Sequence, residues 1–442
     1  MVNSITRRRF LTQAGSVALA AGVGGTLLEA CGGSGGSSSS GPVTLTYGWW
    51  SNGPAKDNAM KDWLGTFTKA NPNITINPEI LSWGDYWSKL QTTVAGGNAW
   101  DIIGMAGGNA APYFDQGALL DLSQFGDLQD ATKNLLQSAV QMTSWKGKQY
   151  ALPVGIYVLM LGYNKSLLQK AGIPFPDPTT PMEFSHFMEI GAKLSIKSGN
   201  QYTQYAININ DLDTLYANFV LMEGGQVYDT PINPKKLMLT DPTNSAAALK
   251  GITDYQNLFT QNLAVPYAEM TNGAFGTGDI DSLLTNKVAF SRVVLGDFSQ
   301  IVQQNLTEQI GVTPLFAING KQVTSGNANS FGIFANSKHP NEAWTFIKWA
   351  TSAGQRGFGQ VSDIPADNTA SAAMGSYIQP AAFTQTLIAC EKNFVPEVMT
   401  PNAQYSTDIG NILTDLANRK ITPAQGVQQI QTKGQADVSS AS

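Results

Sequence analysis

The sequence predicts an α/β protein with two lobes, each built on a mainly parallel sheet flanked by helices. The chain has 442 residues, more than one ordinary hydrophobic core accommodates. Strand and helix patterns alternate from residue 43, and a second alternating set begins near Leu152-Pro153. Hydrophobic residues make up 42% of the chain and aromatic residues 10%, which is enough to fill two large cores.

The N-terminus carries the features of an export signal. Arg7-Arg8-Arg9 precede Phe-Leu and an uncharged run over 14–28, which is the order of a secretory signal and resembles the twin-arginine type. The run ends at Leu28-Glu29-Ala30-Cys31, which is similar to a lipoprotein processing site. We therefore expect residues 1–30 to be removed and Cys31 to carry lipid. The alternative is a transmembrane anchor helix, but the run is short and rich in Gly and Ala.

A tether follows the signal, because residues 31–42 are almost wholly Gly and Ser after Cys31. Once Cys31 carries lipid, Cys390 is the remaining thiol, so neither an intrachain disulfide nor a Cys-rich metal site can form. We expect Cys390 to be a small buried hydrophobe and residues 436–442 to form a tail.

Charge argues against a nucleic-acid partner. Charged residues are 13% of the chain, about half of the usual ~25% in soluble domains. The formal charge of −5 becomes −7 once residues 1–30, with three arginines and one glutamate, are removed. A weakly charged, acidic surface does not suit a phosphate backbone.

The first lobe begins with a strand–helix–strand–helix–strand pattern. We expect strands over 43–48, 74–80 and 101–105, where apolar residues alternate or run together. The intervening helices carry apolar residues at helical spacing: Met60, Trp63, Leu64 and Phe67, then Tyr86, Trp87, Leu90 and Val94. Ligands bind beyond the carboxyl ends of such strands. These ends are Trp49-Trp50-Ser51, Leu81-Ser82-Trp83 and Ala106-Gly107-Gly108-Asn109.

Two later segments predict helix starts. Thr180-Pro181-Met182-Glu183 fits a capping box with proline at the first helical position, followed by an inner face of Phe184, Phe187 and Gly191. Pro340 begins another helix, in which Ala343, Phe346, Ile347 and Ala350 are in register. No repeat of fixed period occurs, which excludes a solenoid.

Four segments match the order and spacing of one known family. They are Leu152-Pro153 with YNKSLLQKAGI (163–173), NKVAF (286–290), SKHPNEAWTFI (337–347) and DIPA (363–366). In this order, behind a lipoprotein-like signal, they resemble the maltodextrin-type extracellular solute-binding proteins of ABC importers, also known as family 1.

The resemblance implies a two-lobed periplasmic-binding-protein-like fold of type II, with the ligand in a cleft that closes by a hinge. It implies a first lobe over 43–153 plus 309–354 and a second over 154–308 plus 355–435. We expect an extracytoplasmic monomer, attached to the membrane by its lipid alone. It would bind a mono- or oligosaccharide and deliver it to an ABC permease, without a cofactor.

Aromatic residues are the first candidates for ligand contact, because a sugar needs flat apolar faces for its C–H groups. Trp49 and Trp50 are consecutive at a strand end, so their side chains point to opposite faces and at least one should lie away from the core. Trp83 lies in a predicted strand-to-helix loop, and Ser51 follows the tryptophan pair. Burial in the core is the alternative for each tryptophan.

Polar candidates follow from the strand ends and from the resemblance. Gly108 and Asn109 match a ligand-touching loop, although an ordinary turn is the alternative. Tyr157 falls where relatives commonly carry an acid. Arg292 is a lone cation that would pair with an acidic sugar or form a structural salt bridge. The resemblance adds Asp213, Tyr216, Gly296, Asp297, Phe298 and Tyr405 in the second lobe, and Asn327 and Asn329 in the first.

Other chemistry finds little support in the sequence. His186 and His339 lie in no triad-like setting, and no phosphate loop, dinucleotide fingerprint or EF-hand loop occurs, so we expect no metal and no cofactor. A secreted carbohydrate-active enzyme would need two facing carboxylates, which no local motif indicates. A ligand-sensing protein without transport stays open, since the sequence does not separate it from an importer component.

Overall fold

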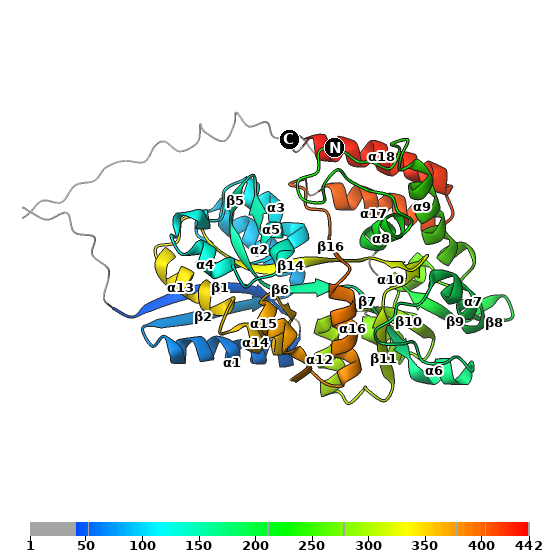
Figure 1. Cartoon of the computed structure of the whole chain (residues 1–442), viewed down its shortest axis with the longest axis horizontal. Coiled ribbons are helices and arrows are strands. Elements are labelled where there is room, and N and C mark those ends of the chain that lie inside the picture. The colour runs from blue at the N-terminus through cyan, green and yellow to red at the C-terminus, as the bar shows by residue number, and fades with distance from the viewer. Residues whose placement is uncertain are drawn as a thin grey trace, which may run out of the picture. The chain divides into compact units, whose positions relative to one another are not determined.

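Figure 1 shows a computed structural model of the chain, which describes residues 41–51, 53–209, 212–276, 279–376, 378–402 and 404–440. The chain divides into two units, Met1–Gly41 and Pro42–Ser442, and the second unit carries the fold. The expected signal over 1–30, the lipidated Cys31 and the tether up to Ser40 lie outside the described residues.

The first sheet has the strand order β15-β6-β14-β3-β1-β2, and β16 also pairs with β14. Its strands are β1 (Val43–Trp50), β2 (Ile74–Leu81), β3 (Ile102–Ala106), β6 (Ala151–Val158), β14 (Thr324–Ile333), β15 (Ile364–Pro365) and β16 (Phe394–Pro396). β1 runs parallel to β2 and β3, as the sequence predicts. β14 runs antiparallel to β3 and β6 because it returns from the second lobe, so the sheet is mixed and not mainly parallel.

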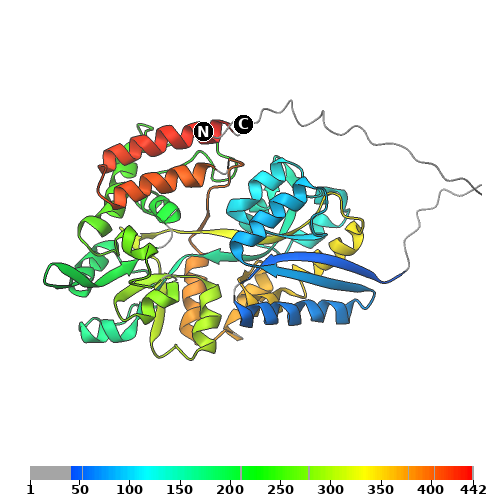
Figure 2. The same cartoon turned by 180° about the vertical axis from the view of Figure 1, so that it is seen from behind.

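Helices cover both faces of the first sheet (Figures 1 and 2). On one face, Trp63 and Phe67 of α1 pack with Phe346 of α13 against Phe331 of β14. The expected apolar stripe of α1 is therefore confirmed as core. The helices of this lobe are α1 (Pro54–Ala70), α2 (Trp83–Ala95), α3 (Gly107–Asp115), α4 (Leu128–Thr132), α5 (Gln137–Met142), α13 (Pro340–Ala350), α14 (Gln355–Val361) and α15 (Asn368–Ala372), with a hairpin of β4 (Ser144–Trp145) and β5 (Lys148–Gln149).

The second sheet has the order β11-β7-β10-β9-β8 and is also mixed, because β10 is parallel to β9 but antiparallel to β7. Its strands are β7 (Met160–Asn164), β8 (Ile196–Ser198), β9 (Gln201–Asn208), β10 (Val288–Val293) and β11 (Ile310–Pro314). Around it lie α6 (Lys165–Lys170), α7 (Phe184–Leu194), α8 (Leu212–Met222), α9 (Ser245–Thr260), α10 (Tyr267–Thr271), α11 (Asp279–Leu284), α12 (Leu295–Gln303), α16 (Ala381–Glu391), α17 (Gln404–Ala417) and α18 (Pro423–Ser440), with the short pair β12 (Ala317–Ile318) and β13 (Lys321–Gln322).

Helix α7 begins later than the capping pattern predicts. Its first residue is Phe184, and Glu183 holds the N-cap position. The Glu183 carboxylate accepts a hydrogen bond from the Gly320 N–H at 2.7 Å, and its backbone pairs with Ala317. Contact with the β12–β13 turn thus overrides the local pattern at 180–183, while Phe184 and the later inner-face residues are buried as expected.

The chain crosses between the sheets from β6 to β7, from β11 to β14 and after β16 (Figure 1). At the first crossing the Leu159 carbonyl accepts from the Thr324 hydroxyl at 2.6 Å, and the Leu159 N–H donates to the Ser325 carbonyl at 3.3 Å. These bonds hold β6 and β14 together where they leave the first sheet.

The crossings shift the lobe ranges from those the resemblance implies. β11 lies in the range expected for the first lobe but pairs in the second sheet, whereas β15 and β16 lie in the range expected for the second lobe but pair in the first. α18 also continues to Ser440, into the expected tail. Strands of two to five residues at a crossing carry too little pattern to reveal which sheet they join.

A glycine pair tests the packing of the first core. A Cβ at Gly104 in β3 would lie 2.3 Å from the Trp49 ring, whereas a Cβ at Gly65 in α1 would meet nothing within 4 Å. We expect Gly104→Ala to lower the unfolding free energy by about 1–3 kcal/mol through overpacking. Gly65→Ala should raise it by up to about 1 kcal/mol through helix propensity. Urea denaturation measures both, and equal effects would contradict this packing.

Candidate functional site

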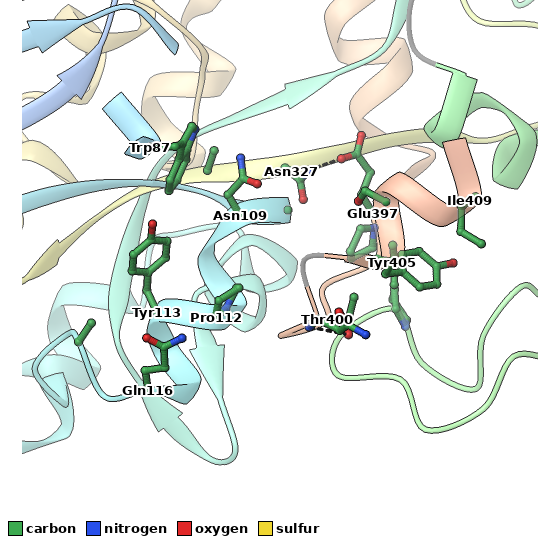
Figure 3. A pocket seen from close by; sticks show the side chains of 18 of the residues that line it. Trp87, Asn109, Pro112, Tyr113, Gln116, Asn327, Glu397, Thr400, Tyr405 and Ile409 are labelled. Atoms are coloured by element: carbon green, nitrogen blue, oxygen red, sulfur yellow. Dashed lines mark hydrogen bonds between the residues drawn. The ribbon is translucent and has the colours of Figure 1, made fainter. Parts of the chain in front are cut away.

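A cleft of about 1310 Å³ lies between the two lobes. Figure 3 shows Trp87, Asn109 and Tyr113 on its first-lobe side and Tyr405 on its second-lobe side, with Asn327 of β14 between them. The cleft is therefore walled by α2 and α3 on one side and by α17 on the other, and the crossing strands form its floor. Of the predicted contact residues, Trp83, Gly108, Asn109, Tyr157, Asn327 and Tyr405 line it.

The first-lobe wall is aromatic because α2 directs its first turns at the cleft. Trp83 is 48% exposed and meets the rings of Trp50 and Trp87 edge-on, with centroids 5.3 and 5.4 Å away. Trp87 is tilted against Tyr113 of α3 at 5.9 Å. The Ser82 hydroxyl, which accepts from the Asp85 N–H at 3.3 Å, fixes the start of α2. An apolar ring face thus remains accessible at the edge of the cleft.

Helix α3 follows β3 without a loop, so Gly107 approaches the cleft floor closely. A Cβ at Gly107 would lie 2.4 Å from Oδ1 of Asn327, which leaves no room for a side chain. Gly108 and Asn109 are exposed in the first helical turn beside it. The predicted positions are on the cleft, but in a helix instead of a turn.

The floor carries a carboxylate that the sequence did not reveal. Glu397, half-buried after β16, accepts a hydrogen bond from the Tyr157 hydroxyl at 2.8 Å on one oxygen and from the Asn327 amide on the other. Asn327 also contacts the Tyr157 hydroxyl at 3.4 Å. The three-residue strand β16 that positions Glu397 is too short to predict from its pattern, so no sequence signal marked this residue.

The second-lobe wall contains a chain of tyrosine hydroxyls. Tyr228 lies between Tyr405, at 2.7 Å, and Tyr216, at 3.2 Å. Tyr228 and Tyr405 line the cleft, whereas Tyr216 is buried behind them. Burial raises the pKa of the Tyr405 hydroxyl well above its usual range, so this group keeps its proton.

The structure places the other predicted residues of the first lobe away from the cleft. Trp49 and Trp50 are 1% and 6% exposed, and their rings stack on each other with centroids 3.9 Å apart, so they do not diverge to opposite faces at the strand end. This corrects the expectation that at least one would leave the core. Ser51 donates to the Asp57 carboxylate at 2.5 Å, and the Asn329 amide donates to Asp363 at 2.8 Å.

The remaining second-lobe candidates whose side chains the structure describes also lie off the cleft. Arg292 forms an ion pair with Asp279 at 2.8 Å. This is the structural salt bridge, one of the two roles predicted for this residue. Phe298 is buried against Phe383, with ring centroids 4.6 Å apart, and Gly296 accepts a hydrogen bond from Lys56. The structure does not describe the side chain of Asp213. Contact of these residues with a ligand stays a prediction.

Neither metal ligands nor a membrane span are found in the described part of the chain. It contains no group of three or more His, Cys, Asp or Glu side chains placed to hold a metal ion. None of its helices combines the length and the apolar character needed to cross a bilayer. Cys390 is a buried free thiol, and burial raises its pKa to about 12.

Comparisons with known proteins agree with this architecture. The sequence model described as bacterial extracellular solute-binding protein matches residues 62–384, which is more than half of the chain. A Brucella abortus protein named as a binding protein is 25% identical over 396 residues, covering 85% of this chain and 90% of the relative.

Two solved structures share the fold. The ABC substrate-binding protein of Listeria monocytogenes in complex with cycloalternan aligns with a TM-score of 0.76 at 18% identity, covering 89% of this chain and 98% of that one. The GacH receptor of Streptomyces glaucescens, solved unliganded and with acarbose, aligns with a TM-score of 0.73 at 18% identity, covering 90% and 99%. These alignments establish the two-lobed α/β fold.

A buried polar contact joins the lobes on the other side of the crossing strands, where α1 meets α12 (Figure 1). Lys56 of α1 donates to the Gly296 carbonyl of α12, close to the carboxylates of Asp297 and Asp363. Burial lowers the pKa of Lys56, raises that of Asp363, and raises that of Asp297 to about 6. Asp279 adds to the shift of Asp297 by charge repulsion.

These shifts predict a pH-dependent stability. An unfolded aspartate has a pKa of about 3.9, so the folded protein holds the Asp297 proton more tightly, and stability falls as the pH rises from about 4 through about 6. Asp297→Asn keeps an acceptor for the Val294 N–H, which Asp297 binds at 2.8 Å, but removes this proton.

Between pH 4 and pH 7, we therefore expect the unfolding free energy of the wild type to fall by about 2 kcal/mol more than that of Asp297→Asn. Urea denaturation across this range measures the difference. Asp62→Asn, at an exposed carboxylate of α1, is the matched control for loss of one charge. Parallel curves for the wild type and Asp297→Asn would contradict the assignment.

Proposed function

Because the chain belongs to the bacterial extracellular solute-binding proteins, we propose that it captures a carbohydrate in the interlobe cleft and delivers it to an ABC importer. The observation that carries this proposal is the pairing of an accessible indole wall, led by Trp83, with amide, hydroxyl and carboxylate groups on the floor and the opposite wall. A sugar presents both kinds of surface, since its ring C–H groups are apolar and its hydroxyls donate and accept hydrogen bonds.

The size of the cleft favours an oligosaccharide. Its volume of about 1310 Å³ exceeds the ~300–1,000 Å³ of a typical small-molecule pocket. Cycloalternan and acarbose, with which the two structural relatives were solved, support this reading by analogy of fold. Tyr405, which keeps its proton, would donate to a hydroxyl, whereas Asn109 and Asn327 both donate and accept.

Transport would use a shift between open and closed lobes. A ligand that contacts both walls only when they are close together stabilises the closed state, and a permease would recognise that state. We propose that the protein acts as a monomer outside the cytoplasm, exported by a twin-arginine-like signal and attached through lipid on Cys31. A sensing role without transport would use the same cleft and closure.

We propose no enzymatic activity. The family consists of binding proteins, and the two acids found among the described residues of the cleft have structural partners: Asp229 accepts from three backbone N–H groups of its own loop, and Glu397 accepts from Tyr157 and Asn327. Steady release of product from an oligosaccharide would overturn this reading.

Thermal shift of the mature protein with a sugar panel tests the proposed ligand class. A ligand that binds the native state alone raises the melting temperature, so at least one mono- or oligosaccharide should do so. Trp83→Ala should weaken binding of that sugar by about 10-fold, because it removes the accessible ring face. Phe175→Ala removes a 44% exposed ring of the second lobe that does not line the cleft, and should leave affinity unchanged. If no sugar shifts the melting temperature, the carbohydrate proposal fails.

The lipid anchor has a separate test. When the full-length protein is expressed in a bacterial host supplied with a labelled fatty acid, the protein should incorporate the label and Cys31→Ser should not, because the acylated residue is lost. Cys390→Ser, at the buried thiol, is the control and should incorporate the label as the wild type does. A wild-type protein that stays in the membrane fraction without incorporating the label would favour an uncleaved anchor helix.

A further inference from the structure

The charges that face the cleft are all negative. Among the described residues that line it, Asp229 and Glu397 are the charged ones, and none is Lys, Arg or His. The positions after Gly41 that the description leaves out also hold no basic residue. An anionic ligand would therefore enter the cleft without a cation to meet it.

The two acids differ in what holds them. One oxygen of Asp229 accepts from the backbone N–H groups of Thr230, Lys235 and Lys236, at 2.9, 3.1 and 3.2 Å, so this carboxylate organises its own loop. Glu397 is instead held by two side chains of the cleft floor, Tyr157 and Asn327. Both are neutral donors, so neither adds a positive charge beside the carboxylate.

Two basic residues that could offset this charge lie outside the described lining of the cleft. Arg292, a candidate for an acidic sugar on sequence grounds, is paired with Asp279 outside the cleft. Lys235, next to the Asp229 loop, donates to the Asn233 side chain at 3.3 Å and is not among the residues that line the cleft. Among the described residues of the floor, Glu397 is thus the one that carries a charge.

We propose that Glu397 sets the charge class of the ligand, so that the cleft takes uncharged or amine-bearing sugars and excludes carboxylated and phosphorylated ones. A hydroxyl or ammonium group donates to the carboxylate, whereas an anionic group placed there is repelled in a partly desolvated site. This inference rests on the proposed carbohydrate function and narrows it. Glu397 acts here as a specificity-determining residue.

Sugars that share a skeleton and differ in charge test the inference. The probes are cellobiose, cellobiouronic acid and the glucosamine dimer, together with the neutral and uronic forms of maltose, mannobiose and galactobiose. Calorimetry on the mature wild-type protein should give a Kd for a neutral sugar at least ~10-fold below that of its uronic counterpart. Glu397→Gln should reduce the ratio of the Kd of the uronic sugar to the Kd of the neutral sugar by about 10-fold. The same variant should lose more affinity for an amine-bearing sugar than for a neutral one.

The controls separate the local charge from other effects. Glu308→Gln removes an exposed carboxylate outside the cleft and should keep the wild-type ratio. Tyr157→Phe keeps the Glu397 charge but removes one of the donors that position it, so it should weaken binding while preserving discrimination against uronic acids.

The outcomes are distinguishable. A uronic acid that binds the wild type as tightly as its neutral counterpart overturns the inference, whether or not a variant folds. If the ratio of the uronic Kd to the neutral Kd is the same in Glu397→Gln as in the wild type, Glu397 does not determine the charge class of the ligand. If no probe binds in any charge form and no sugar of the panel raises the melting temperature, the proposed carbohydrate function fails, and this inference with it.

Discussion

The pairing of β6 with β14 is the constraint on which the rest of the molecule depends. These strands belong to the first sheet, yet both continue into segments that cross to the second lobe. The bonds between Leu159, Thr324 and Ser325 hold the crossing in register. Since Tyr157 and Asn327 are paired across the same strands, the cleft floor is built on the part of the fold that joins the lobes.

That arrangement gives three polar side chains of β14 a partner on another segment. Ser325 bonds Asn218 of α8, Asn327 bonds Glu397, and Asn329 bonds Asp363, so alternate residues of one strand each find a partner on a different segment. A buried polar group without a partner costs about 1–3 kcal/mol, and that cost remains at Asn218 Nδ2 and Asn327 Oδ1, which find no partner among the described residues. These contacts give the crossing strands polar anchors on both lobes.

Local pattern predicted the elements whose burial is periodic and missed the contacts made at a distance. The strands at β1, β2 and β3 follow from runs or alternation of apolar residues, and the stripe of α1 follows from apolar residues at helical spacing, because these positions pack in the core. The burial of both Trp49 and Trp50 required knowing that their rings stack on each other and pack against Phe358 of α14 and Trp87 of α2. Glu397 depends on β16, and the start of α7 depends on a turn more than a hundred residues away. The six predicted residues on the cleft lie at strand ends, at a helix start, or where family motifs align.

The close approach of Gly107 to Asn327 has a consequence for how this cleft can diversify. A methyl group at 107 would collide with the floor amide, so that position is closed to variation. Its neighbour differs, since a Cβ at Gly108 would sit 3.8 Å from the Asn327 nitrogen, an ordinary contact. A library designed to change ligand preference would therefore hold Gly107 fixed and draw its diversity from Gly108, Asn109 and Tyr113, where a new side chain projects into open space and leaves the scaffold intact.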